Sequence, residues 1–290
     1  MRAVDPSGSA HPAYTIGLIG AGIQGSLSPL LHTRAAARHG LRCHYRLLDL
    51  KEPGTAGAPE LVARARAEGL RGVGVTHPCK QSVLPVLDRL SPEAEAIGAV
   101  NTIVFDAQGA TGHNTDGTGF MASLRHGLPG ARLDRVAVLG AGGAGAAVAH
   151  ALLAGGARRL TVLDADPAPA GRLAARLSAG FGGDRVRDAP LTTLAAVLER
   201  ATGLVNATPV GMPGSPGCPV PARLLRPGLW VADLVYRPAE TELLSLAGKA
   251  GCPTLPGGGM LVFQAVEGFR LFTGIRPDAR RMLADLATAV

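Results

Sequence analysis

The chain has 290 residues and a mass of 29.5 kDa, enough for one large domain or two ordinary ones. Hydrophobic residues make up 47% and charged residues 18%, which excludes an intrinsically disordered protein. Aromatic residues make up only 3%, which leaves little material for stacking RNA bases or sugar rings. The net charge is +7, and because the basic residues are scattered we expect a small anionic ligand, with no nucleic acid and no membrane partner.

The cysteines and histidines do not form a metal or disulfide pattern. The four cysteines are far apart in the chain, with no C-x-x-C pair, so we expect no metal site and a reducing, cytoplasmic location. His32, His77 and His113 lack ligand spacing and are interpreted as structural. The first twelve residues are polar and predict a loose extension without a signal peptide.

The first part of the chain alternates short strands and helices. An apolar run at 15–19, a Gly-rich turn, a helix over 30–39 and a strand over 44–50 predict a β-α-β opening. We expect further elements as follows: a helix over 59–68, a strand over 72–76, an irregular helix over 81–87 and a hairpin of strands 99–106 and 109–114.

The pattern restarts after a Gly-Leu-Pro-Gly segment at 127–130. The predicted elements are a strand over 136–139, a helix to 154, a strand over 160–163, a helix over 193–200, strands over 203–206 and 229–235, and helices over 260–272 and 278–289. The uncharged stretch 136–157 contains six glycines, which favours strand, turn and helix over a membrane helix. Two α/β domains follow from the alternation.

A G-x-G-x-x-G motif at Gly140, Gly142 and Gly145 has the full context of a dinucleotide site. A strand precedes it, a helix of small residues follows, and Asp164 ends the next strand, 24 residues after Gly140. Such a motif places a pyrophosphate at the N-terminus of the helix and the ribose hydroxyls on the acidic residue. The alternative is a Gly-rich turn that only packs a helix close to a sheet.

The same motif occurs earlier, at Gly20, Gly22 and Gly25, but its context differs. Ser26-Leu27-Ser28-Pro29 stands before the helix, so two hydroxyl groups lie at the helix N-terminus. One interpretation is a serine N-cap, with Pro29 in the first turn. The other is a site for a small carboxylate, held by the hydroxyls and the positive helix end.

Lys80 is the candidate acid-base residue, and Asp116 is a second candidate functional residue. The chain has only three lysines against 26 arginines, and a lysine can lose its proton where an arginine cannot. Lys80 follows a predicted strand end and a proline turn, whereas the other two lysines flank helices in polar segments. Surface placement of Lys80 and helix capping by Asp116 are the alternatives that residue type and position leave open.

Eight motifs in fixed order now identify a resemblance. Together they resemble the shikimate dehydrogenase family over residues 14–277, and the SLSP, T-x-P-x-K and NTD elements are that family's substrate-side signature. The motifs are SLSP at 26–29, VTHPCK at 75–80, GAVNT at 98–102, NTDGTGF at 114–120, GAGGAG at 140–145, NATPVGM at 206–212, VYRPAET at 235–241 and MLVFQAVEGF at 260–269.

The resemblance implies an architecture and a reaction. It implies an N-terminal substrate domain of residues 1–121 and a C-terminal Rossmann dinucleotide-binding domain of residues 122–259, with the helical segment 260–290 returning to the substrate domain. It implies reversible hydride transfer between C3 of shikimate and a nicotinamide, with Lys80 as the general acid/base and Asp116 orienting it. The ligand would be a small anionic polyhydroxy carboxylate, and the protein a monomer or homodimer.

The other site residues are also carried over from the resemblance. Ser26 and Ser28 would bind the substrate carboxylate, and Thr76, Asn101, Tyr236 and Gln264 would surround the ring hydroxyls. The family commonly has Asn where this chain has Gly74, which affects a local turn contact or the fit of a ring substituent. The cofactor-binding residues would be Gly140, Ala141, Gly142, Gly143, Ala144, Gly145, Asp164, Asn206, Thr208 and Gly257.

NAD is the expected cofactor. A carboxylate at Asp164 accepts hydrogen bonds from both ribose hydroxyls and repels a 2'-phosphate, and no arginine follows before Arg172. NADP-dependent members typically show an Asn-Arg-Thr segment here, so the chain resembles the NAD-dependent quinate/shikimate branch. The alternatives are a dehydrogenase acting mainly on quinate or aminoshikimate, or a noncatalytic ligand sensor.

Overall fold

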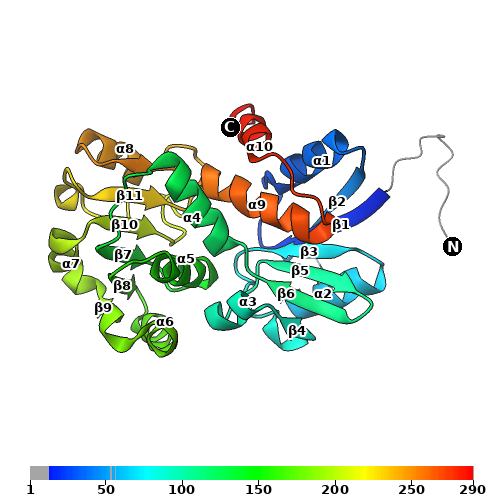
Figure 1. Ribbon diagram of the computed structural model, residues 1–290, viewed down its shortest axis with the longest axis horizontal. Coiled ribbons are helices and arrows are strands. Elements are labelled where there is room, and N and C mark those ends of the chain that lie inside the picture. Colours follow the sequence, from blue (N-terminus) through cyan, green and yellow to red (C-terminus); the bar gives the residue numbers. More distant parts are fainter. Residues whose placement is uncertain (1–12, 53, 56, 290) are drawn as a thin grey trace.

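The computed structural model describes residues 13–52, 54–55 and 57–289. Two six-stranded sheets lie beside one another, each with helices packed against it, and α4 (Asp116–Gly127) and α9 (Gly258–Thr273) run between them (Figure 1). This confirms the prediction of two α/β domains. The predicted N-terminal extension lies outside the described residues.

The N-terminal domain is built on a mixed sheet with the strand order β2-β1-β3-β5-β6-β4. Strands β1, β2 and β3 are parallel, whereas β5 is antiparallel to both β3 and β6. Its strands are β1 (Ala13–Gly20), β2 (Arg42–Asp49), β3 (Gly72–Val75), β4 (Arg89–Leu90), β5 (Thr102–Asp106) and β6 (Gly109–His113), and its helices α1 (Ser28–Arg38), α2 (Ala58–Ala67) and α3 (Pro92–Ile97).

The C-terminal domain is a fully parallel sheet with the order β12-β11-β10-β7-β8-β9. Counted from β7, this is the strand order of a dinucleotide-binding Rossmann fold. Its strands are β7 (Arg135–Leu139), β8 (Arg159–Asp164), β9 (Val186–Pro190), β10 (Gly203–Asn206), β11 (Trp230–Asp233) and β12 (Thr254–Leu255), and its helices α5 (Gly143–Ala154), α6 (Pro167–Phe181), α7 (Leu194–Arg200) and α8 (Glu242–Lys249).

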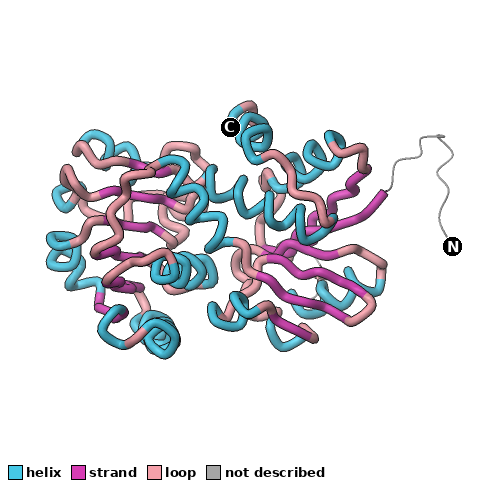
Figure 2. Tube along the Cα trace, in the orientation of Figure 1, coloured by secondary structure: helices cyan, strands magenta, loops and turns pink. Residues whose placement is uncertain are grey.

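The end of the chain returns to the N-terminal domain, as expected. Leu31 on α1, Phe269 on α9 and Met282 on α10 (Ala279–Ala287) are fully buried in one apolar cluster. Burying such side chains contributes roughly 1.5 to 3 kcal/mol each, so this contact holds α9 against the first sheet. The tube view shows α9 passing from the junction of the domains to α1 (Figure 2).

Glycines let α4 lie directly against α9. A β-carbon on Gly119 of α4 would lie 2.7 Å from the backbone nitrogen of Gln264 on α9, too close for any side chain. Both helices therefore pass through the junction at backbone contact distance. Asp116 begins the first helix and Gln264 lies in the second, so this packing fixes two of the predicted site residues next to one another.

Several elements were missed from the sequence. No element was predicted between residues 163 and 193, yet α6 begins at Pro167. Pro167 and Pro169 both lie in the first turn, where a missing N–H costs little, and Asp166 caps the helix. Thr241 likewise caps α8. The predicted helix 81–87 is wrong: only Leu84–Val86 forms a single 3-10 turn. Among the described residues, none of the helices is long and apolar enough to cross a membrane.

Candidate active site

Lys80 and Asp116 form an ion pair at the junction of the two domains. Lys80 lies in the turn after β3, and its Nζ is 2.5 Å from Oδ2 of Asp116 at the start of α4. The Asp116 side chain is 1% exposed and that of Lys80 15%. A buried carboxylate therefore holds an amine that keeps access to the surface, which is an arrangement suited to moving a proton.

Asp116 does not cap its helix through its side chain, because α4 has no side-chain cap. Its second oxygen, Oδ1, accepts a hydrogen bond from Nδ2 of Asn101 at 2.9 Å. The same amide nitrogen is 3.1 Å from Oε1 of Gln264 on α9. The structure thus brings Lys80, Asp116, Asn101 and Gln264 into one connected group.

Two neighbours of this group were not singled out from the sequence. The Thr115 hydroxyl is 2.9 Å from Nδ2 of Asn101, and Oδ1 of Asn114 accepts the backbone N–H of Asp116 at 3.0 Å. Both are buried. They belong to the same Asn-Thr-Asp motif as Asp116. The motif was therefore the sequence signal by which both residues could have been found.

A second group of hydroxyls lies at the first glycine turn. Ser26 is hydrogen-bonded to the Tyr236 phenol and Ser28 to the phenol of Tyr45 on β2. Burial raises the pKa of both phenols, which keeps them neutral hydrogen-bonding groups. Tyr236 thus lies beside Ser26, and its expected place near the ring hydroxyls stays a prediction. Tyr45 was missed, since a tyrosine in a strand carries no local signal.

The serine N-cap interpretation fails for α1. The N-cap residue is Leu27, and no side chain caps the helix; instead the Ser26 Oγ accepts the N–H of Ser28 at 3.2 Å. The turn brings these serines close to β3, because Ala21 N–H bonds to the His77 carbonyl at 3.0 Å. Thr76 is also adjacent: a β-carbon on Gly20 would lie 2.4 Å from its methyl group.

The first glycine turn is closed to a pyrophosphate by the protein itself. The carboxylate of Asp49 accepts the N–H groups of Gly22 and Ile23 at 2.8 and 2.9 Å. Burial acts to raise the pKa of Asp49, but backbone donors led by the Lys51 N–H outweigh it and hold that pKa below its usual value. The N–H groups of Gly22 and Ile23 are therefore already occupied by the Asp49 carboxylate and are not free to bind a phosphate.

The second glycine turn leaves the amides at the start of α5 available. Gly142 is the N-cap of α5, no side chain caps that helix, and a β-carbon on Gly142 would meet nothing within 4 Å. The first N–H groups of a helix have no partner within the helix. Gly140 has a φ of +97°, and a β-carbon on Gly145 would lie 2.0 Å from the Gly140 carbonyl oxygen, so the turn needs both glycines.

The other predicted cofactor residues lie at or just after the carboxyl ends of β8, β10 and β12 in the same sheet. Asp164 accepts the Ala141 N–H at 2.7 Å. The amide of Asn206 is consumed within the protein, by Asp233 at 2.9 Å and by the Thr208 hydroxyl at 2.6 Å. A β-carbon on Gly257 would lie 2.5 Å from the Leu234 carbonyl oxygen. Their roles toward a cofactor stay predictions.

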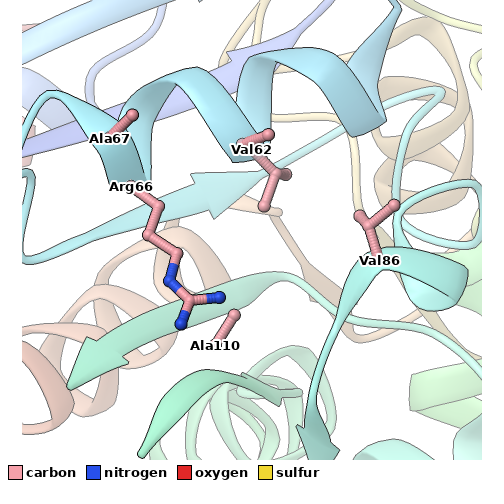
Figure 3. A pocket seen from close by; sticks show the side chains of 6 residues that line it. Val62, Arg66, Ala67, Val86 and Ala110 are labelled. Atoms are coloured by element: carbon pink, nitrogen blue, oxygen red, sulfur yellow. The ribbon is translucent and has the colours of Figure 1, made fainter. Parts of the chain in front are cut away.

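One hollow of the N-terminal domain lies away from this site. A depression of about 440 Å³ is lined mainly by Val62, Arg66, Val86 and Ala110 beneath α2 (Figure 3). Its polar group, the Arg66 guanidinium, is ion-paired with Asp88 at 3.0 Å, so it lacks converging polar groups. In the described part of the chain, acidic, histidine and cysteine side chains form no group that could hold a metal ion.

The comparisons with known proteins agree with this geometry. Residues 18–103 match the model of the shikimate dehydrogenase substrate binding domain, and residues 257–286 match that of the shikimate 5'-dehydrogenase C-terminal domain. A shikimate dehydrogenase (NADP(+)) of Streptomyces avermitilis is 59% identical over 95% of each chain. The chain belongs to the shikimate dehydrogenase family. A quinate/shikimate dehydrogenase (NAD(+)) of Corynebacterium efficiens is 43% identical over 94% of this chain and 98% of its own.

Solved structures of family members share the whole fold. The quinate dehydrogenase of Corynebacterium glutamicum, solved with NAD, has a TM-score of 0.89 and 42% identity, covering 96% of this chain and all of its own. The shikimate 5-dehydrogenase of Thermus thermophilus, solved with NADP(H) and shikimate, has a TM-score of 0.81 and 35% identity over 96% of this chain and 100% of its own. The relatives therefore differ in cofactor while sharing the fold.

Proposed function

We propose that this chain is an NAD-dependent dehydrogenase that reversibly oxidises shikimate to its 3-dehydro ketone. The observation that carries the proposal is the Lys80–Asp116 pair, 2.5 Å apart and adjoining the open glycine turn of a Rossmann domain. Acid-base groups and a dinucleotide turn meet at one junction, as hydride transfer from an alcohol requires. Membership of the family supports the same reaction.

The residues of the C-terminal domain fit a nicotinamide dinucleotide. Gly142 and Gly143 present backbone N–H groups at the start of α5, with open space at Gly142. Asp164 lies at the end of β8, where such folds hold the ribose. When bound, the nicotinamide supplies the acceptor for the hydride that leaves C3 of the substrate. Residues 122–259 form the cofactor domain in this proposal, and 1–121 with 260–290 the substrate domain.

Lys80 moves the proton that accompanies the hydride. In the direction of oxidation, the uncharged amine takes the proton of the C3 hydroxyl as the C–O bond becomes a carbonyl. In the direction of reduction, the ammonium returns that proton to the carbonyl oxygen. Asp116 holds Nζ in place through the ion pair at 2.5 Å. General acid-base groups contribute about 100- to 10,000-fold to such reactions.

The substrate is held at its two ends by the two polar groups at the junction of the domains. Ser26, Ser28 and Tyr236 bind the carboxylate, because their hydroxyls cluster at the start of α1, where the helix favours an anion. Asn101, Gln264 and Thr76 surround the ring hydroxyls near Lys80. A ligand with one carboxylate and several hydroxyls matches both groups, which favours shikimate or quinate.

NAD is preferred in this proposal because of Asp164. Two negative charges about 4 Å apart repel by roughly 4 kcal/mol at an effective dielectric near 20, and solvent screening reduces this. A 2'-phosphate would meet that repulsion. NADP is the second candidate, supported by the printed name of the relative that is 59% identical. Steady-state rates with shikimate and quinate, each with NAD and NADP, separate these possibilities.

A further inference from the structure

We propose that Arg237 binds the substrate carboxylate and selects for the charged acid. The inference rests on the proposed function, since it concerns the same substrate. Arg237 directly follows Tyr236, whose phenol is hydrogen-bonded to Ser26. It comes from the C-terminal domain, whereas Ser26 and Ser28 belong to the N-terminal domain. With Tyr236, Arg237 would give the C-terminal domain a second contact to this end of the ligand, and the only charged one.

The guanidinium of Arg237 reaches the first glycine turn. A β-carbon placed on Gly25 would lie 3.2 Å from Nη1 of Arg237, and no other atom would come within 4 Å of it. Gly25 is the residue before Ser26. The side chain thus crosses from the segment after β11 to the residue beside the serine hydroxyls, and the absence of a side chain at Gly25 leaves room for it.

The charge of Arg237 is not used elsewhere in the part of the chain that the structure describes. Arginines such as Arg38, Arg66 and Arg89 pair with acidic groups, but no ion pair or hydrogen bond of the Arg237 guanidinium is found among the described residues. Arg237 is exposed to solvent. The hydroxyl cluster has no positive charge of its own, and the unpaired guanidinium beside it would supply the charge that binds a carboxylate.

A guanidinium would change the selectivity of this end of the site. Hydroxyl groups can donate to a carboxylate or to the carbonyl oxygen of its uncharged methyl ester, whereas a guanidinium forms an ion pair with two parallel hydrogen bonds only with the carboxylate. Ser26, Ser28 and Tyr236 would therefore position the ligand. Arg237 would discriminate shikimate from its ester.

The test compares Arg237→Gln and Arg237→Lys with the wild type, using shikimate and methyl shikimate. We expect Arg237→Gln to raise KM for shikimate about tenfold or more, with kcat within about threefold, and to leave KM for the ester and for NAD within about twofold. Arg237→Lys should restore part of the lost affinity. Calorimetric titration with shikimate should show the same loss without turnover.

Lys51→Gln is the matched control. Lys51 is a cation near the same turn, with its Nζ 3.2 Å from a β-carbon placed on Gly22, but it is further along the turn from Ser26. It should change KM for shikimate by less than about twofold. An equal change in both variants would show general attraction of anions and overturn the inference.

Other results also overturn it. Equal losses for acid and ester would show that Arg237 only maintains the turn, and a raised KM for NAD alone would place it at the cofactor. An unchanged KM for shikimate would show that the guanidinium does not contact the ligand. The proposed function fails separately, if the wild type oxidises neither shikimate nor quinate.

Discussion

Gly143, the first residue of α5, lies against Lys80, and a β-carbon placed on it would be 2.8 Å from the Lys80 β-carbon. The glycine belongs to the dinucleotide turn of one domain and the lysine to the substrate domain. The two domains therefore touch at the point where the proposed chemistry occurs. The contact involves the Lys80 β-carbon, which is fixed by the backbone, whereas the amine end of the side chain could move to another rotamer.

Gly143→Ala should consequently lower turnover. The new methyl group would force α5 and the turn that carries Lys80 apart, and a misplacement near 1 Å can cost about 100-fold. We expect kcat for shikimate oxidation to fall at least about tenfold while the protein stays folded. Gly180→Ala on α6, where a β-carbon would meet nothing within 4 Å, is the control, and the assignment fails if both variants keep the wild-type kcat.

Lys80→Ala should remove most activity and leave binding largely intact. The proton would have to move without a positioned base, which predicts a loss of about 100- to 10,000-fold in kcat. Shikimate affinity, measured by calorimetry, should stay within about tenfold because the hydroxyl groups remain. Lys249→Ala on α8 is the control. A variant that retained more than about a third of wild-type turnover would remove Lys80 from the mechanism.

Ser28→Ala tests the assignment of the first glycine turn to the substrate. Losing one hydrogen bond to a charged group costs about 1.5 to 3 kcal/mol, so KM for shikimate should rise about tenfold or more. NAD affinity should be unchanged, and Ser245→Ala on α8 should affect neither. Equal losses of shikimate and NAD affinity in Ser28→Ala would place the nucleotide at the first turn.

Asp164→Ala should narrow the preference for NAD over NADP. The substitution removes the acceptor of the ribose hydroxyls and the charge that opposes a 2'-phosphate, so kcat/KM with NAD should fall more than with NADP. Even if solvent screening leaves only about 1.4 kcal/mol of the repulsion between Asp164 and the 2'-phosphate, the preference for NAD would be about tenfold. Asp188→Ala, an exposed acid on β9, is the control. If kcat/KM of the wild-type enzyme with NADP equals or exceeds kcat/KM with NAD, the proposed role of Asp164 is wrong.

Stability should fall in mild acid because of His32. The ring is buried among Tyr45, Phe269 and Phe272, and burial lowers its pKa from 6.5 to about 4. Between these values the unfolded chain takes up a proton that the native state does not, so the native state loses stability as pH falls. The loss from pH 7 to pH 5 should be about 2 kcal/mol.

His32→Leu should abolish that part of the pH dependence. Urea unfolding at both pH values measures it, and His44→Leu, at an exposed position on β2, should keep the wild-type dependence. If His32→Leu loses as much stability between pH 7 and pH 5 as the wild type, the buried ring does not cause the effect.

The sequence predicted the fold well where local patterns coincide with tertiary contacts. The strands of the Rossmann sheet are continuous apolar runs, because a parallel sheet is buried on both faces. The glycines of the G-x-G-x-x-G motif mark the turn between the first of these strands and the helix that follows. Helix α6 was missed because prolines such as those at 167 and 169 interrupt a helix interior, and only the placement of both in the first turn allows a helix.

The site was predictable where its residues lie in motifs. Lys80 stood out by its rarity. Its partner lies 36 positions away, and only tertiary packing brings the start of α4 to the turn after β3, which no local pattern encodes. The same holds for Tyr45 and Arg237, which reach the serine turn from a distant strand and from the other domain. Residues that meet only through tertiary packing need the structure.

The central claim is tested most directly by following nicotinamide reduction when purified protein is mixed with NAD and shikimate, beside the Lys80→Ala variant. The account predicts shikimate-dependent formation of reduced NAD by the wild type, slower with NADP, and at least about 100-fold slower in the variant. Absence of reduction with both shikimate and quinate, in either cofactor, would contradict it.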